Sequence, residues 1–107
     1  NCQLLGPVQV QPGAVVRDSV LHGPCLICAQ AVVEESTLGP NVSVGAGSTV
    51  RRSRLVRAIL SEQCVVEDAP AGLVDTVLGE RVRVAGLTGA AGPISVVVGD
   101  SGVVRGL

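Results

Sequence analysis

The sequence predicts an all-β fold, a single-stranded parallel β-helix of hexapeptide repeats with about five coils. Three observations lead to this prediction. The 107 residues are 47% hydrophobic but include no Phe, Trp, Tyr or Met, so small aliphatic side chains must fill the core. Aliphatic residues recur at an interval of 17 residues. Fourteen Gly and six Pro interrupt every segment that could otherwise form a helix.

Five columns of residues follow the 17-residue interval, three of them aliphatic and two of them small. They are Val10, Ile27 and Val44; Val16, Val33 and Val50; Leu21, Leu38 and Leu55; Ala14, Ala31 and Ser48; and Ser19, Ser36 and Ser53. A further unit fits with one residue deleted and places Leu60, Cys64, Val66 and Ala69 in these columns. Beyond this unit the register loosens, although Leu78 and Val84, and Val98 and Val104, keep a six-residue spacing.

Each coil is expected to consist of three hexads in which an aliphatic residue is followed, four positions later, by a small one. Residues 10–15, 27–32 and 44–49 show this pattern. The aliphatic side chain of a short strand points inward, and the small residue allows a tight corner. Three hexads close a triangle of about 18 residues, and the coils stack at about 4.8 Å, the usual spacing between strands.

We expect residues 1–107 to form one β-helix domain. Regular coils span 1–84, a loop with three Gly spans 85–93, and 94–107 forms the last strand and corner. Within this last part, 94–98 is expected to be a strand and 99–102 a corner. The chain begins with Asn and opens within the repeat, which indicates a fragment of a longer protein.

Composition and charge exclude several classes of function. Eight Arg against nine acidic residues give a net charge of −1, which argues against a nucleic-acid or membrane partner. No apolar run is long enough to cross a bilayer and no signal peptide opens the chain, so we expect a cytoplasmic protein with reduced thiols.

The charged residues favour pairing between coils over a binding patch. Two charged residues follow the second aliphatic column in successive coils. They are Arg17 and Asp18, Glu34 and Glu35, Arg51 and Arg52, and Glu67 and Asp68. Stacking places basic beside acidic side chains, which predicts a cross-strand charge ladder. Arg54 and Arg57 stay unpaired in this scheme and are expected to be available to another subunit.

The only histidine and the cysteines give two candidate sites. His22, the only histidine, is a candidate general base for acyl transfer, but no neighbouring carboxylate in the sequence would orient it, so we expect a solvated corner residue. His22, Cys25, Cys28 and Cys64 are a candidate zinc set. The repeat places Cys28 at an outer corner and Cys64 in an inward column, so we expect no metal site.

Four segments resemble the C-terminal domain of long-form glucose-1-phosphate thymidylyltransferases: Ser19-Val-Leu-His-Gly-Pro-Cys-Leu-Ile27, Glu35-Ser-Thr-Leu-Gly-Pro-Asn-Val-Ser-Val-Gly45, Ser53-Arg-Leu-Val-Arg-Ala-Ile-Leu60 and Val97-Val-Gly-Asp-Ser101. The resemblance implies a left-handed coil. It also implies that the nucleotidyltransferase chemistry, and its Mg²⁺, belong to an N-terminal catalytic domain. This chain has no Gly-rich phosphate loop, so we expect no catalytic, cofactor-binding or metal residues in it.

The leading hypothesis is therefore a non-catalytic oligomerisation or regulatory domain of a sugar-phosphate nucleotidyltransferase. The parent enzyme would form dTDP-glucose and pyrophosphate from dTTP and glucose 1-phosphate. The expected partners are further copies of the chain, joined through the β-helix, and its own N-terminal catalytic domain. The alternatives are an acetyl-coenzyme-A-dependent hexapeptide acyltransferase and a free-standing structural or binding β-helix.

Overall fold

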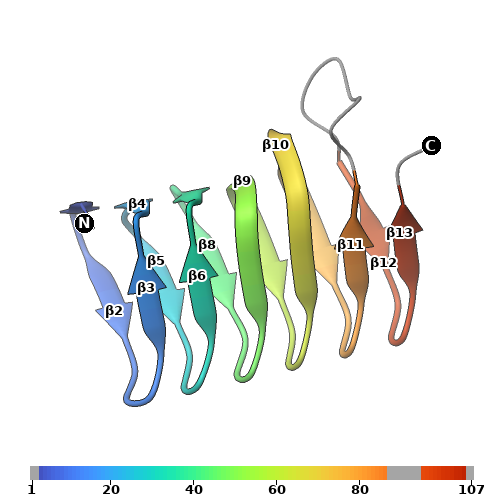
Figure 1. The fold of residues 1–107 in the computed structure, drawn as a ribbon, viewed down its shortest axis with the longest axis horizontal. Helices are drawn as coiled ribbons and strands as arrows, with labels where there is room; N and C mark the ends of the chain where they lie inside the picture. Colours follow the sequence, from blue (N-terminus) through green and yellow to red (C-terminus); the bar gives the residue numbers. More distant parts are fainter. Residues whose placement is uncertain (1–2, 87–94, 106–107) are drawn as a thin grey trace.

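The computed structural model describes residues 3–86 and 95–105, and this part of the chain is a parallel β-helix. Thirteen strands join in one sheet that winds into about five stacked turns, which we call coils (Figure 1). Every strand pairing between the described residues is parallel, and no helix occurs among them. The all-β, parallel β-helix prediction is thus confirmed, while the hand of the coil stays a prediction.

The strands form three faces. The first face contains β2 (Val8–Val10), β5 (Cys25–Ile27), β8 (Val42–Val44) and β12 (Val97–Val98). The second contains β3 (Val15–Arg17), β6 (Val32–Glu34), β11 (Arg83–Ala85) and β13 (Val103–Arg105). The third contains β1 (Gln3–Leu5), β4 (Val20–His22) and β7 (Thr37–Leu38). Two longer strands, β9 (Thr49–Leu60) and β10 (Val65–Leu78), bend round the corners and contribute to all three faces.

The strand register confirms the aliphatic columns. On the first face Val10 pairs with Ile27, Ile27 with Val44, and Val44 with Leu60. The other two columns align in the same way, Val16 to Val33, Val50 and Val66, and Leu21 to Leu38 and Leu55. From the second coil onward these side chains are buried, with exposed fractions of 0 to 2%. One continuous stack of aliphatic side chains is therefore the core.

The register changes beyond Ala69, as expected, but the columns continue. Leu55 pairs with Leu73 and Leu60 with Leu78, an interval of 18 residues, after a register shift between Ala69 and Leu73. Leu78 then pairs with Val98 across the segment that contains 87–94. Extra residues are thus added between columns, and the columns themselves continue.

Three boundaries near the C-terminus can be compared with expectation. β11 extends to Ala85, the first residue of the range expected as a loop; residues 87–94 lie outside the described part. The strand expected at 94–98 is shorter, because β12 consists of Val97–Val98 and Ile94 is not described. Residues 99–102 form the corner that was expected.

A ladder of serine hydroxyls supports one corner of the solenoid. Ser36 Oγ donates a hydrogen bond to the Glu34 carbonyl at 2.7 Å and accepts one from the Ser53 amide at 3.2 Å. Ser19 and Ser53 repeat this arrangement, and the amide of Ala69 closes the ladder. The column of Ser19, Ser36 and Ser53 therefore serves two purposes: its small side chains fit the corner, and its hydroxyls form hydrogen bonds with buried backbone groups.

Candidate functional site

An outward column of uncharged side chains runs along the first face. The strand register aligns its six members in successive coils, and we call them the uncharged column: Gln9, Leu26, Ser43, Ile59, Val77 and Val97. The residues next to each member in its strand point inward. Because side chains alternate along a β-strand, the member itself points outward. Four of the six are aliphatic, a composition that is typical of a surface that becomes covered.

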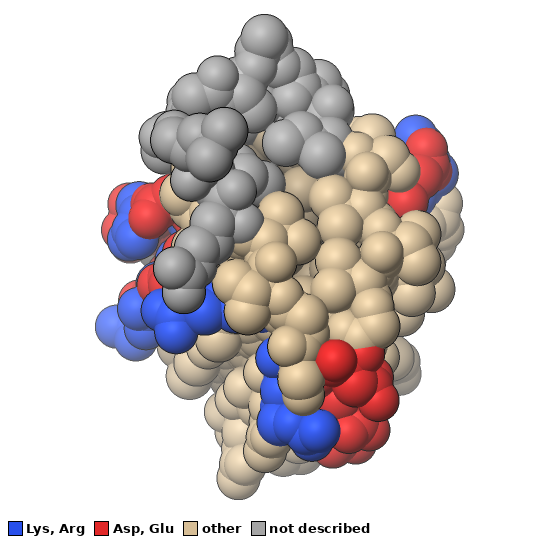
Figure 2. Space-filling view, turned by 90° about the vertical axis from the view of Figure 1, so that its right-hand side faces the viewer, with Lys and Arg blue, Asp and Glu red and all other residues tan. Residues whose placement is uncertain are grey.

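Three of the four aliphatic members of this column are exposed, and the fourth, Leu26, is half-buried. The exposed fraction is 52% for Ile59, 44% for Val77 and 79% for Val97, whereas Ala58 and Leu60 beside Ile59 are almost fully buried. Charged side chains lie elsewhere: in the end-on view of Figure 2, blue and red side chains gather in mixed groups near the edges of the molecule. The first face therefore combines an apolar strip with polar corners.

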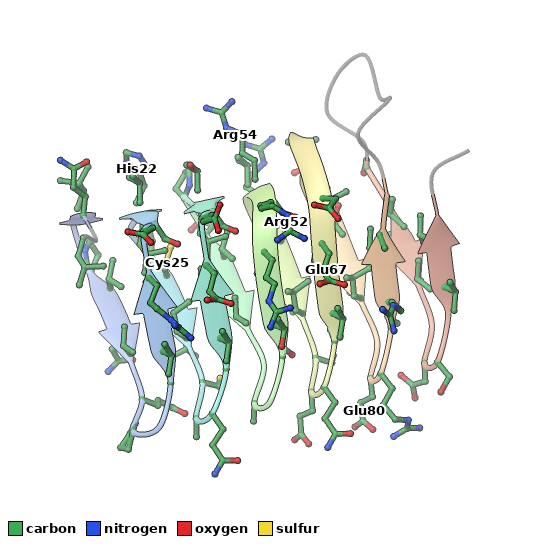
Figure 3. The ribbon with its side chains drawn as sticks, in the orientation of Figure 1. His22, Cys25, Arg52, Arg54, Glu67 and Glu80 are labelled. Carbon is green, nitrogen blue, oxygen red and sulfur yellow. The ribbon has the colours of Figure 1, made fainter. Side chains whose placement is uncertain are left out.

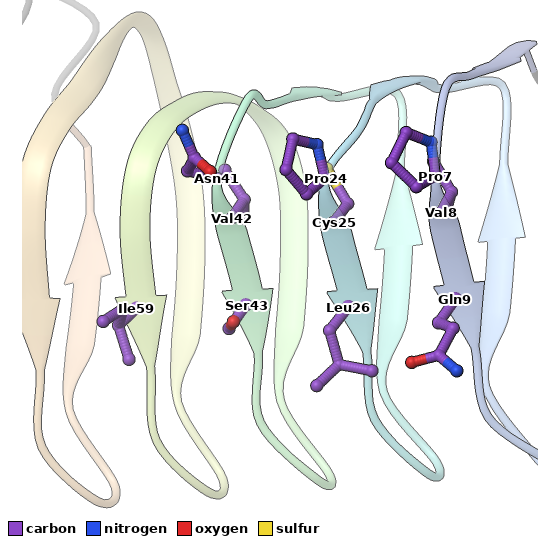
Figure 4. Close-up of a pocket in the computed structure, with 10 residues that line it drawn as sticks. All are labelled: Pro7, Val8, Gln9, Pro24, Cys25, Leu26, Asn41, Val42, Ser43 and Ile59. Atoms are coloured by element: carbon purple, nitrogen blue, oxygen red, sulfur yellow. The ribbon is translucent and has the colours of Figure 1, made fainter.

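A shallow groove of about 700 Å³ occupies this face near its corner with the third face. Its lining is Pro7, Val8, Gln9, Pro24, Cys25, Leu26, Asn41, Val42, Ser43 and Ile59. Figure 4 shows Leu26 and Ile59 projecting from the coils on either side of the short Ser43. The lining contains no carboxylate, imidazole or basic group, so the groove favours contact with an apolar surface over acid–base chemistry.

The second face carries the predicted charge ladder. Glu34 pairs with Arg17 at 3.3 Å and with Arg51 at 3.1 Å, and Arg51 also pairs with Glu67 at 3.4 Å. Arg83 extends the ladder by one further coil, 3.7 Å from Glu67. These cross-strand ion pairs confirm the prediction, and they engage Arg17, Arg51 and Arg83 with carboxylates of the same face.

Another part of the charge prediction is wrong. Arg57 is not left unpaired, because its Nε lies 2.6 Å from Asp75 Oδ1. The two residues are 18 apart, so only the longer interval after Ala69 brings them together, whereas a 17-residue interval would have placed Val74 opposite Arg57. Arg54 is exposed and, within the described residues, has no ion pair.

Hydrogen bonding lowers the pKa of two carboxyl groups at the corners. Arg57 lowers the pKa of Asp75, and Arg52 lowers the pKa of Asp68, in each case mainly through a side-chain hydrogen bond. Figure 3 places Arg52 beside β10, on which Asp68 lies. Both pairs are exposed to solvent, so their role is to favour one coil register over another.

His22 does not form part of a catalytic arrangement in the described residues. It is exposed at the end of β4, and its side chain points away from the solenoid (Figure 3). Its backbone carbonyl accepts a hydrogen bond from Cys25 Sγ at 2.8 Å, and its imidazole makes none with the described residues. The imidazole thus lacks the orienting partner that a general base for acyl transfer uses.

The four residues of the candidate zinc set do not come together. Cys25 and Cys64 are buried, Cys28 is half-buried and His22 is exposed, and no group of three metal-binding side chains occurs in residues 3–86 and 95–105. Burial raises the pKa of the Cys25 and Cys64 thiols, which disfavours the thiolate form that binds metals. All three described cysteines are free thiols, as expected.

The described residues also offer no fit for the Mg²⁺ that the resemblance implies for the parent enzyme, because they contain no cluster of carboxylates. They include no helix that could cross a membrane. Comparison of the sequence with protein-family models and with curated proteins finds no match, so the resemblance depends on the motifs alone.

The uncharged column is the feature that sequence reasoning missed. The column contains no charged or nucleophilic cluster, and four of its six members are aliphatic. A signal was present: the residue just before each inward member of the first aliphatic column is itself aliphatic at Leu26, Ile59, Val77 and Val97.

Proposed function

We propose that this chain is a non-catalytic self-association domain of a sugar-phosphate nucleotidyltransferase of the glucose-1-phosphate thymidylyltransferase type. The observation that carries the self-association is the uncharged column, which exposes Ile59, Val77 and Val97 on a regular sheet face. Exposed aliphatic strips of this kind mark surfaces that bind other proteins. The hexapeptide motifs support the assignment to a nucleotidyltransferase.

The chemistry would belong to an N-terminal catalytic domain of the same cytoplasmic protein. That domain would bind Mg²⁺, join the nucleotidyl group of dTTP to glucose 1-phosphate and release pyrophosphate. The solenoid would hold several catalytic domains in a fixed arrangement. A parallel β-helix suits this task, because each coil is braced by hydrogen bonds to its neighbours.

Self-association is tested by analytical ultracentrifugation of residues 1–107 at about 1 to 100 μM. A Kd in the micromolar range or below is expected, which corresponds to a free energy of association of about −8 kcal/mol or one that is more favourable. A sample that is monomeric at every concentration would overturn the assembly role.

The link to a nucleotidyltransferase is tested by the reading frame upstream of Asn1. A Gly-rich phosphate-binding segment that follows a strand is expected there. An initiator Met directly before Asn1 would contradict this link and favour a free-standing β-helix.

A further inference from the structure

The side chains of the uncharged column differ in size along the face, so that a second copy of the column can fit against it. This inference rests on the proposed self-association and specifies its geometry. Ser43 is short and lies between the larger Leu26 and Ile59, so the column has a hollow with a projection on either side (Figure 4). The Ser43 hydroxyl makes no hydrogen bond within the described residues, so nothing in the fold requires a hydroxyl at this position.

We propose that two copies of the chain pack their first faces together about a two-fold axis that passes between the coils of Ser43 and Ile59. Rotation about this axis exchanges the two coils, so Ile59 enters the hollow over the partner's Ser43. It also brings Leu26 against the partner's Val77. Each contact occurs twice, as in any isologous interface.

The size of the face fits a dimer. The first face stacks six strand segments at about 4.8 Å, each about 17 to 20 Å long with its corners, which gives a footprint of about 500 to 600 Å² on each copy. The total of about 1,000 to 1,200 Å² lies at the lower limit for a specific interface.

The charges around the face fit the usual anatomy of an interface. The uncharged column forms its centre, and the corners on either side carry paired charges, Arg57 with Asp75 and Arg81 with Glu80. An apolar centre with a polar rim is the arrangement found in protein–protein interfaces. The absence of net charge from the column favours a second copy over a charged partner, because like faces then meet without repulsion.

The test exchanges the projection and the hollow. Ile59→Ser would place Ser opposite Ser, and Ser43→Ile would place Ile opposite Ile. Each single variant is expected to weaken dimerisation by about tenfold or more in Kd. The double variant, Ser43→Ile with Ile59→Ser, restores one large and one short residue at each contact. Its Kd is expected to return to within about threefold of the original value, a non-additive result of the kind that contacting residues give.

Val15→Ser is the matched control, because Val15 is an exposed aliphatic residue on the second face. Its Kd should equal that of the unaltered chain. Far-ultraviolet circular dichroism and thermal unfolding show whether each variant is folded.

Four results would overturn the proposal. If Ser43→Ile strengthened dimerisation, or if the double variant stayed weak, the two-fold axis would lie elsewhere. If every variant dimerised like the unaltered chain, another face would form the contact, while the proposed self-association would stand. If the unaltered chain were monomeric, both proposals would fail.

Discussion

Single residues fix which coils lie next to each other. The ion pair between Arg57 and Asp75 joins two coils at an exposed corner, and the hydrogen bond between them lowers the pKa of Asp75. A carboxyl group with a lowered pKa in the folded state adds stability at pH values above its unfolded pKa. This stability is lost as the pH falls through the folded value. The contribution therefore disappears in acid, below about pH 4.

This pair gives a prediction at the scale of one residue. In an NMR titration, the Asp75 carboxyl is expected to titrate below the usual range of Asp, and Arg57→Gln should return its pKa toward the usual value. Arg54→Gln is the control, because Arg54 is an exposed arginine that has no ion pair within the described residues. An Asp75 pKa that is already ordinary in the unaltered protein would contradict the structure.

At the scale of the strand and its corner, the serine ladder joins successive coils through buried hydrogen bonds. The Ser36 hydroxyl accepts a hydrogen bond from the Ser53 amide. Ser36 is only 5% exposed, so water does not readily replace this hydroxyl as the partner of the amide. Ala69 occupies the same column in a later coil, which shows that an alanine side chain fits this corner.

Ser36→Ala is therefore expected to lower the free energy of unfolding by about 1 to 3 kcal/mol, the cost of leaving a buried amide unpaired. Chemical denaturation measures this change. Ser61→Ala removes a hydroxyl that makes no hydrogen bond with the described residues and should change stability by about 0.5 kcal/mol or less. Equal effects of the two substitutions would show that the ladder adds nothing.

The sequence was sufficient to predict the elements wherever side-chain identity repeats. The columns of Val33, Leu38 and Ser36 were visible because each coil requires the same side chain at the same place. The exact register after Ala69 was not predictable. Two extra residues at a corner change the interval between columns, and this change becomes visible only once the next coil has been aligned. The pairing of Arg57 was missed for the same reason. The uncharged column follows from the sequence only when the strand alternation is applied to the residue beside each inward member, because that alternation turns this residue outward.

At the scale of the whole molecule, the solenoid is built from coils that contact only their neighbours. Inner strands such as β9 pair on both sides, whereas β1 and β2 each pair with one strand. The first coil accordingly leaves Leu4 53% and Val10 42% exposed. Stability should therefore vary along the axis of the solenoid.

Hydrogen exchange tests this expectation. Amides that donate from β9 and β10 should be the most protected, and those of β1 and β2 should exchange at least about tenfold faster, because local opening of a terminal coil breaks fewer contacts. Uniform protection in all coils would show that the solenoid opens only as one cooperative unit.

The register shift between Ala69 and Leu73 has a practical consequence. Two residues were accommodated at this corner, and the inward stack continues on both sides of them. Short foreign peptides grafted at the same corner should be displayed on the outside of an intact scaffold, so the chain offers a natural attachment point for an epitope or a fluorescent label.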